Sequence, residues 1–279
     1  MGSAGDMNMY FVRQSFDQTQ TNPFNHHQPY TNEWIMLQLL EQADFKQFTG
    51  GGADGVFQLV ITKANVDWEY RIFDFIQYES ETGKNIILAI DKQDYETAQK
   101  TYGRHNYKDR FLRPYEHKVL MHATDKENHA AILRDGCLKS WNLLKQLATV
   151  TEERPIGSLL GDPLDYRDYI MFSGGGISAE RVISSRQKGR IEMGIDVPYV
   201  AGARFYFDAA KIAEDGLLVR DGAHLKVRDT LPLDRYLLWI ATPDALGISE
   251  NTTPRVFAEK ADQMFQEKCG IALNRDTRS

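Results

Sequence analysis

The 279-residue chain has little of what marks several common protein classes. Its only cysteines, Cys137 and Cys269, are too few for a disulfide framework or a structural zinc site. No apolar run approaches the roughly 20 residues that a membrane-spanning helix needs. The N-terminus has no basic patch followed by an apolar stretch, so we see no secretory signal. From these absences we expect a protein of the reducing cytoplasm with no membrane association.

Several catalytic signatures are also missing. No Gly-x-Gly-x-x-Gly follows a predicted strand, and no Gly-x-x-x-x-Gly-Lys-Ser/Thr is present, which disfavours a Rossmann fold and a P-loop. The histidines show no metal-ligand spacing, so we expect no metal. Ser173 and Ser178 have no nearby His–Asp pair, which argues against a serine hydrolase.

The composition itself is that of a globular protein, with 42% hydrophobic and 26% charged residues. The net charge is −6, but residues 100–190 hold 16 Lys and Arg against 11 Asp and Glu, a local net charge of +5. A positive middle in an acidic chain suits a site for a phosphate-bearing ligand. Chance clustering on a solvated face explains the same numbers.

The chain divides into four parts by composition and pattern. Residues 1–30 are polar and predict a flexible arm, and residues 31–112 predict an α+β subdomain. Residues 113–245 predict the main domain. Residues 246–279 predict a C-terminal helix, with its amphipathic pattern over 254–268. Within the second part we expect a helix over 31–48 and strands over 56–62, 68–78 and 85–90. Strands outnumber long helices without alternating with them, which indicates an α+β fold.

One stretch carries a recognisable chemical pattern. The predicted strand 117–124 ends in His122, Ala123 and Thr124, where a side chain can reach a ligand beyond the sheet. Asp125 predicts the N-cap of a helix over 126–134, and Gly136 predicts its left-handed end. A satisfied core histidine remains the alternative for His122.

This stretch resembles the His-Gly-Ser/Thr signature of the ADP-ribosyltransferase superfamily, which includes poly(ADP-ribose) polymerases and tRNA 2′-phosphotransferases. Three later segments follow in the family's order, at 169–189, 205–225 and 231–236. In the first we expect a strand over 169–172 and, after the glycine run, a helix over 178–188; the third resembles the last strand of the family. The resemblance covers roughly residues 113–242 and leans towards the branch that acts on nucleic acids. It implies a split β-sandwich, with residues 31–112 as an N-terminal extension.

The resemblance implies that NAD binds in a cleft headed by His122. The histidine would hydrogen-bond the nicotinamide-side ribose, the backbone of Ala123 would contact the nicotinamide amide, and Thr124 would assist. Breaking the glycosidic C–N bond builds positive charge on the ribose, so a rigid hydrogen-bonding frame lowers the barrier by positioning and electrostatics.

The pyrophosphate of NAD needs cations, and the guanidinium fork of arginine suits it. Arg186 aligns with a phosphate-contacting arginine of the phosphotransferases, with Arg181 and Lys188 as further candidates. Ser173 precedes the run Gly174-Gly175-Gly176, which either cradles a phosphate before a helix or simply connects two elements. A salt-bridged surface position is the alternative for Arg186.

Two departures from the family pattern bear on catalysis. Met171 stands where the polymerases have tyrosine, although Tyr169 lies on the same strand face and offers a ring to stack on nicotinamide. Arg235 takes the place of the glutamate on the last strand, with Asp234 beside it as the replacement acid. His122, Tyr169 and Asp234 are thus the expected catalytic residues.

We therefore expect NAD-dependent transfer of ADP-ribose to a macromolecule, with nucleic acid as the favoured acceptor. The size suits a bacterial toxin, whose N-terminal region would then contact a protein partner or antitoxin. One alternative is an RNA 2′-phosphotransferase that uses NAD, although its Arg-His pair has no counterpart beyond Arg104-His105. The other is an inactive module that binds NAD or ADP-ribose.

Overall fold

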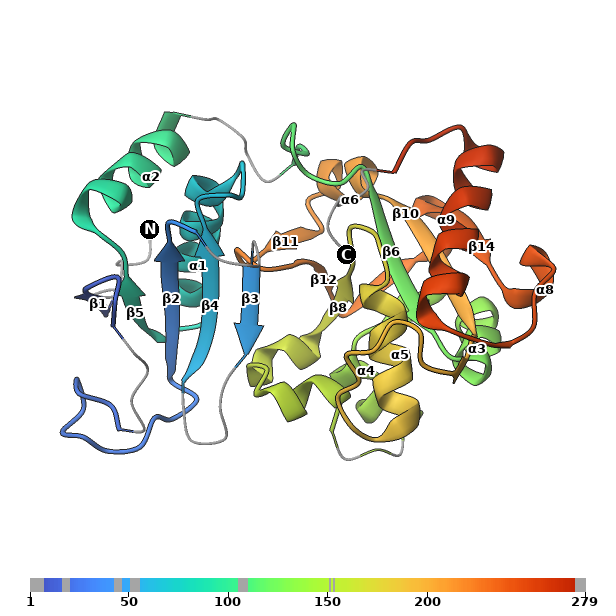
Figure 1. Ribbon diagram of the computed structural model, residues 1–279, viewed down its shortest axis with the longest axis horizontal. Helices are drawn as coiled ribbons and strands as arrows, with labels where there is room; N and C mark the ends of the chain where they lie inside the picture. The colour runs from blue at the N-terminus through green and yellow to red at the C-terminus, as the bar shows by residue number, and fades with distance from the viewer. Residues whose placement is uncertain are drawn as a thin grey trace. The chain divides into compact units, whose positions relative to one another are not determined.

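The structure is a computed structural model that describes residues 8–16, 21–42, 47–50, 56–104, 110–150, 152 and 154–273. The chain forms two compact units (Figure 1). The N-terminal unit comprises residues 1–106 with two later segments, 160–166 and 220–224. The C-terminal unit comprises residues 107–159, 167–219 and 225–279. Both helices and strands are present throughout, so the expected mixed α+β class is confirmed at this level.

The N-terminal unit is built on one five-stranded sheet in the order β1-β5-β2-β4-β3. Strands β1, β5, β2 and β4 run parallel, and β3 runs antiparallel to β4. The helix α1 provides the crossover that parallel strands require, and α2 packs against α1. The elements are β1 (Met9–Val12), β2 (Trp34–Leu40), β3 (Gln47–Gly50), β4 (Phe57–Thr62), α1 (Trp68–Glu81), β5 (Asn85–Ala89) and α2 (Lys92–Arg104).

Two expectations for this unit are wrong. Residues 34–40, expected within a helix, form the central strand β2, which has buried neighbours on both sides. A strand buried on both faces has a continuous apolar run and lacks the alternation that reveals a half-buried strand. Residues 68–78, expected as a strand, belong to α1, whose buried positions include Ile72, Phe75 and Ile76.

Residues 8–16 and 21–30, which we expected to belong to a flexible arm, pack against the sheet. Strand β1 pairs with β5, with Met9 opposite Ile86. Tyr10 then packs against Phe24 and Trp34, with ring centroids 4.8 and 5.0 Å apart. This aromatic contact covers the sheet face that α1 leaves free, so burial of the aromatic rings holds this part of the chain in place.

The C-terminal unit contains two three-stranded sheets, in the orders β14-β10-β6 and β11-β12-β8. Its elements are β6 (Val119–Thr124), α3 (Lys126–Asp135), β7 (Cys137–Lys139), α4 (Trp141–Gln146), β8 (Tyr169–Phe172), α5 (Ser178–Lys188), β9 (Tyr199–Val200), β10 (Ala203–Asp208), α6 (Ala209–Glu214), β11 (Leu218–Arg220), β12 (Leu225–Arg228), β13 (Thr230–Pro232), α7 (Leu233–Tyr236), β14 (Leu237–Ala241), α8 (Pro243–Leu246), β15 (Asn251–Thr252) and α9 (Pro254–Cys269). Two 3-10 turns, Ile156–Leu160 and Leu164–Asp168, precede β8.

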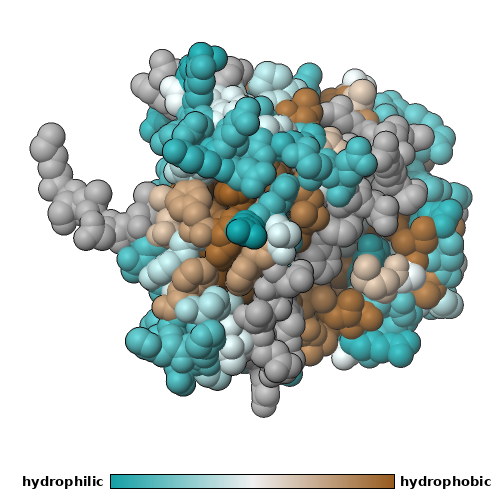
Figure 2. Space-filling view, turned by 60° about the vertical axis from the view of Figure 1, so that its left-hand side comes forward, coloured by the Kyte–Doolittle hydropathy of each residue, from teal (hydrophilic) through white to brown (hydrophobic). Residues whose placement is uncertain are grey.

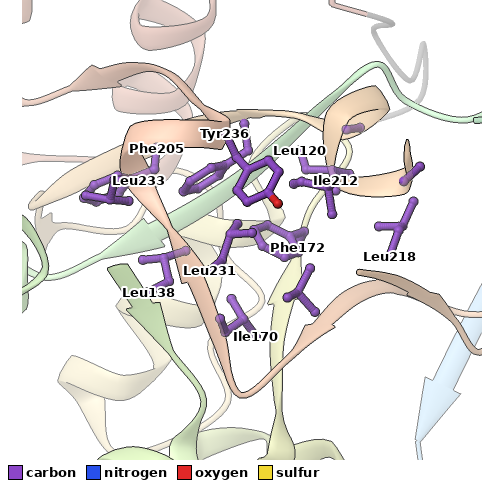
Figure 3. Close-up of a cluster of buried hydrophobic side chains, with 14 of the residues drawn as sticks. Leu120, Leu138, Ile170, Phe172, Phe205, Ile212, Leu218, Leu231, Leu233 and Tyr236 are labelled. Carbon is purple, nitrogen blue, oxygen red and sulfur yellow. The ribbon is translucent and has the colours of Figure 1, made fainter. Parts of the chain in front are cut away.

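A short backbone contact joins the two sheets, which also share a hydrophobic core. Met121 of β6 and Ser173, just after β8, form an antiparallel bridge with backbone hydrogen bonds of 2.8 and 2.9 Å. Beneath it lies a core in which Phe172, Ile170 and Leu231 converge (Figure 3). A second core packs α5 and α9 against the opposite face of β6 and β10.

One expectation for the C-terminal unit is wrong, and another is confirmed. The strand expected over 231–236 ends at Pro232, and residues 233–236 form the helical turn α7. The last strand of the sheet is instead β14, which pairs with β10. The amphipathic helix expected over 254–268 is confirmed as α9, which Thr253 caps at its start and Gly270 ends in a left-handed conformation.

Apolar residues are exposed at scattered positions of both units. In the view of Figure 2, hydrophobic residues gather in the middle of the face, with hydrophilic residues above and below them. Exposed apolar side chains of this kind are normal on folded proteins. Among the described residues, no helix has the length and apolar character to cross a membrane.

Candidate functional site

The His-Ala-Thr tripeptide lies at the end of β6, as expected. His122 is opposite Phe205 of the neighbouring strand β10. The Asp125 carboxylate accepts a hydrogen bond from the Asn128 N–H at 2.9 Å, which caps α3. Gly136 ends α3 with a φ of 67°, a conformation that favours glycine. The predicted helix start and stop are therefore confirmed, and they fix the chain that follows His122.

His122 connects the two sheets of the C-terminal unit. Its Nδ1 lies 3.2 Å from the carbonyl oxygen of Met171 in β8, and its ring meets the Phe172 ring at 6.2 Å. Because a carbonyl only accepts, Nδ1 carries the proton and Nε2 keeps its lone pair. Burial lowers the pKa of His122, although the Met171 carbonyl opposes this effect. At neutral pH the side chain is thus a neutral imidazole with an acceptor nitrogen.

The next two residues are fixed through their backbone. Ala123 and Thr124 pair with Arg204 and Ala203 of β10, and Thr124 is buried. The adjacent Gly202 lies so close that a Cβ there would be 2.2 Å from the Thr124 carbonyl oxygen. A glycine at this position therefore allows the chain after β6 to pass directly beside the start of β10.

We expect Gly202→Ala to disrupt the end of the tripeptide. The added methyl group would meet backbone atoms of Thr124, Asp125 and Lys126 within 2.5 Å, so the backbone itself must move. Overpacking of this kind costs about 1–3 kcal/mol. Urea unfolding measures the loss. Gly103→Ala, at a helical position with no atom within 4 Å of the new Cβ, is the matched control and should not destabilise the protein. Equal stability of the two variants would contradict the close approach.

Arg186 of α5 lies beside the tripeptide. Its Nη1 is 3.0 Å from the Asp125 carboxylate, the helix cap that directly follows Thr124. Its Nε is 2.9 Å from the Glu152 carboxylate, which Nη2 also contacts. The structure thus brings the expected phosphate-binding arginine to the end of β6, and two carboxylates balance its charge there.

The other expected phosphate contacts have local partners. Lys188 forms an ion pair with Glu192 at 2.9 Å, one turn further along the chain. Arg181 directs Nη2 at the sulfur of Met193, and its Nε is buried without a hydrogen-bond partner. The Ser173 hydroxyl donates to the Gly175 carbonyl at 2.8 Å, which closes the glycine loop before α5.

Tyr169 at the start of β8 has a partner that the sequence did not suggest. The ammonium of Lys226 lies 4.6 Å from the centre of the Tyr169 ring, and Lys226 is fully buried. Lys226 is also opposite Met171 in the β8–β12 ladder. A cation held over an aromatic face is favourable when it is shielded from water. In the sequence, the available signal was a lysine between the apolar residues Leu225 and Val227.

Asp234 and Arg235 do not lie on a strand. Both are exposed on the helical turn α7, and Arg235 forms an ion pair with Asp215 at 2.5 Å. The Tyr236 hydroxyl donates to the other oxygen of Asp215 at 2.6 Å. No hydrogen bond or ion pair joins Asp234 to His122 in this described region. The strand placement that supported a catalytic Asp234 is therefore wrong.

A buried charged network behind the tripeptide was missed at the sequence level. Arg204 of β10 is fully buried and lies 2.6 Å from Glu180 and 3.1 Å from Asp262. It also donates to the Gly176 carbonyl at 3.0 Å. Despite the desolvation of Arg204, the carboxylates of Glu180 and Asp262 raise its pKa, whereas burial raises the pKa of Glu180. In the sequence, the arginine within the otherwise apolar run 203–207 was the available sign of this buried network.

The N-terminal unit contains a second buried charged cluster. Lys84 lies 3.1 Å from Glu79 and 2.8 Å from Asp165, which belongs to the segment 160–166 of this unit. Burial raises the pKa of Glu79 to about 7, against the opposing effect of Lys84. Burial also raises the pKa of Asp162 to about 6.

These raised pKa values predict that stability falls as the pH rises. The folded state retains protons on Glu79 and Asp162 at pH values where the unfolded chain has lost them, so the folded state binds more protons between about pH 4 and 7. This stabilisation is complete below the pKa values that Glu79 and Asp162 have in the unfolded chain. It is lost as the pH rises through the pKa values that they have in the folded protein. We expect the free energy of unfolding to fall by about 4 kcal/mol between pH 5 and 8, with the larger share from Glu79.

Urea unfolding at both pH values measures this change. Glu79→Gln removes the titrating group, so its free energy of unfolding should depend less on pH than that of the unaltered protein. An identical pH dependence in the two proteins would contradict the assignment to Glu79.

No protein-family model, curated protein or solved structure matches this chain. The described part of the chain contains no group of three or more His, Cys, Asp or Glu side chains arranged to hold a metal ion.

Proposed function

We propose that the C-terminal unit is an ADP-ribosyltransferase-like split β-sandwich that binds NAD beside His122. The observation that carries the proposal is the position of this histidine. It follows the single Met121–Ser173 bridge between the two sheets, and its ring reaches across to the Met171 carbonyl of β8. An acceptor nitrogen held this way is suited to a ribose hydroxyl that enters between the strands.

The proposed reaction transfers ADP-ribose from NAD to a macromolecule. The C–N bond between ribose and nicotinamide breaks, nicotinamide leaves as a neutral molecule, and a nucleophilic acceptor atom bonds to the ribose carbon and loses its proton to water. His122 orients the ribose while the backbone at Ala123 holds the nicotinamide amide. Because His122 is neutral, it adds no positive charge beside the developing oxocarbenium ion.

Three further observations support this proposal. Arg186 lies next to the helix cap that follows the tripeptide, where its guanidinium suits a pyrophosphate. Tyr169 supplies a ring on the same strand as Met171, although Lys226 already lies over one of its faces. The excess of Lys and Arg over residues 100–190 favours a nucleic acid as the acceptor.

The experiment is incubation with NAD, followed by chromatography of free nicotinamide, with RNA, DNA or protein added in separate reactions. Release that one class of acceptor stimulates, with ADP-ribose found on that acceptor, supports the transferase. Release stimulated only by RNA that carries a 2′-phosphate, with loss of that phosphate, indicates the RNA 2′-phosphotransferase instead.

A second candidate function is an inactive module that binds NAD or ADP-ribose. The observation that favours it is the lack of an acid beside His122: no described carboxylate forms a hydrogen bond or ion pair with its ring, and Asp234 is exposed on α7. NAD binding without nicotinamide release under any acceptor condition would support this module and contradict the transferase.

We expect Arg186→Ala to weaken NAD binding about tenfold, because a charged hydrogen bond to phosphate contributes about 1.5–3 kcal/mol. Glu152→Gln should strengthen binding, since the Glu152 carboxylate competes with the pyrophosphate for the same guanidinium. Calorimetry at low and high salt measures both effects, and Arg186→Ala should also reduce the salt dependence. An unchanged affinity in Arg186→Ala would assign this residue to the surface ion pairs alone.

A further inference from the structure

A cavity of about 460 Å³ opens in the C-terminal unit at the beginning of β6. Val119 lines it, and His122 lies three residues further along the strand, roughly 10 Å away. The volume falls in the range of small-molecule sites, about 300–1,000 Å³. The residues proposed to bind NAD do not line this cavity, so it is separate from the site of the proposed function.

The cavity has an apolar floor. Val119, Leu238 and Ile271 contribute to it, and all three belong to the core between β6, β10, β14 and α9. Leu112 and Pro114 extend the apolar lining from the segment that precedes β6. A ligand in this cavity would therefore bury an apolar body against the edge of an existing core.

Four charged residues line the cavity: Arg113, which is buried, and Glu116, Lys118 and Asp208. The Glu116 carboxylate accepts from the Arg113 N–H at 2.9 Å, and Asp208 caps α6 by accepting from the Lys211 N–H at 3.2 Å. Asp208 also has the Lys211 ammonium at 3.7 Å. Lys118 is exposed at the cavity, and its ammonium has no hydrogen bond or ion pair with any residue that the structure describes.

We propose that this cavity binds a small amphipathic organic anion, with its apolar part on the floor and its carboxylate or equivalent group on Lys118. The carboxylates of Glu116 and Asp208 already accept hydrogen bonds from neighbouring N–H groups. The anionic group of a ligand would therefore pair with the ammonium of Lys118. A neutral ligand would leave Lys118 without a partner, and a cationic ligand would be repelled by it.

Isothermal titration calorimetry of the full chain with octanoate tests the proposal, with octan-1-ol as the neutral counterpart. We expect saturable octanoate binding at one site and weaker binding of octan-1-ol. Lys118→Gln should weaken octanoate binding about tenfold and leave octan-1-ol unchanged. Lys260→Gln, at an exposed lysine of α9, is the matched control and should bind octanoate normally.

A cavity-filling variant gives a second test. Ala210→Phe places a ring at a lining position and should remove binding of both probes. The proposal is overturned if octanoate does not saturate a site, if octan-1-ol binds as tightly as octanoate, or if Lys118→Gln binds octanoate normally. Competitive displacement of octanoate by NAD would also overturn it, because the cavity would then belong to the dinucleotide site.

Discussion

Replacing His122 by alanine should lower the rate of nicotinamide release from NAD by about 100- to 1,000-fold, the usual cost of losing one positioned hydrogen-bonding group at a reacting centre. The imidazole is the side chain that the Met171 carbonyl holds between the two sheets, with its acceptor nitrogen free. Without it the ribose loses its partner at the step that builds positive charge. A time course of released nicotinamide at saturating NAD measures the effect.

The matched control is His129→Gln. His129 lies on α3 and meets the ring of Phe205, the residue opposite His122, at 5.8 Å. It is thus a second histidine on the same side of the strand pair, but it is not at a strand end. We expect this variant to keep its activity within a few-fold. Full activity in His122→Ala, or an equal loss in both variants, would contradict the assignment of the site.

Replacing Arg204 by methionine should reduce the free energy of unfolding by about 3–5 kcal/mol. Arg204 is fully buried between Glu180 and Asp262, and the Tyr206 hydroxyl donates to Asp262 at 2.8 Å. Methionine fills the space but leaves two carboxylates without their cation. Urea unfolding measures the loss, and the glycine loop after β8 should loosen as well because Arg204 binds the Gly176 carbonyl.

Two further variants separate this charge effect from a packing effect. Arg204→Met combined with Glu180→Gln removes one of the uncompensated charges and should recover part of the lost stability. Arg228→Met, at an exposed arginine 3.9 Å from Asp229, should change stability by less than about 0.5 kcal/mol. If Arg204→Met costs no more than Arg228→Met, the network does not stabilise the fold.

Local signals predicted much of the C-terminal unit. Asp125 and Gly136 bound α3 as expected, and the predicted strand, glycine loop and helix over 169–188 correspond to β8 and α5. The N-cap Asp125 and the left-handed glycines Gly136 and Gly189, which end α3 and α5, act within a few residues of the chain. A single sequence therefore contains the information that they need.

Signals that depend on tertiary contacts were misread. The apolar run of β2 is equally consistent with a buried helix, and only its parallel neighbours β4 and β5 decide for a strand. The same limit applies to the site. Arg186 meets Asp125, 61 residues away in the chain, and Lys226 lies over Tyr169. Both contacts follow from strand pairing and register, which no local sequence pattern encodes.

The most direct test of NAD binding at His122 is an NMR titration of histidine-labelled protein with NAD. The titration follows the ring nitrogens of His122. Before NAD is added, we expect a neutral imidazole protonated on Nδ1. As NAD binds, the Nε2 resonance should shift and then reach a plateau. His122→Ala identifies the signal by its loss. An Nε2 resonance that stays unchanged at saturating NAD would contradict the claim that His122 holds the ribose.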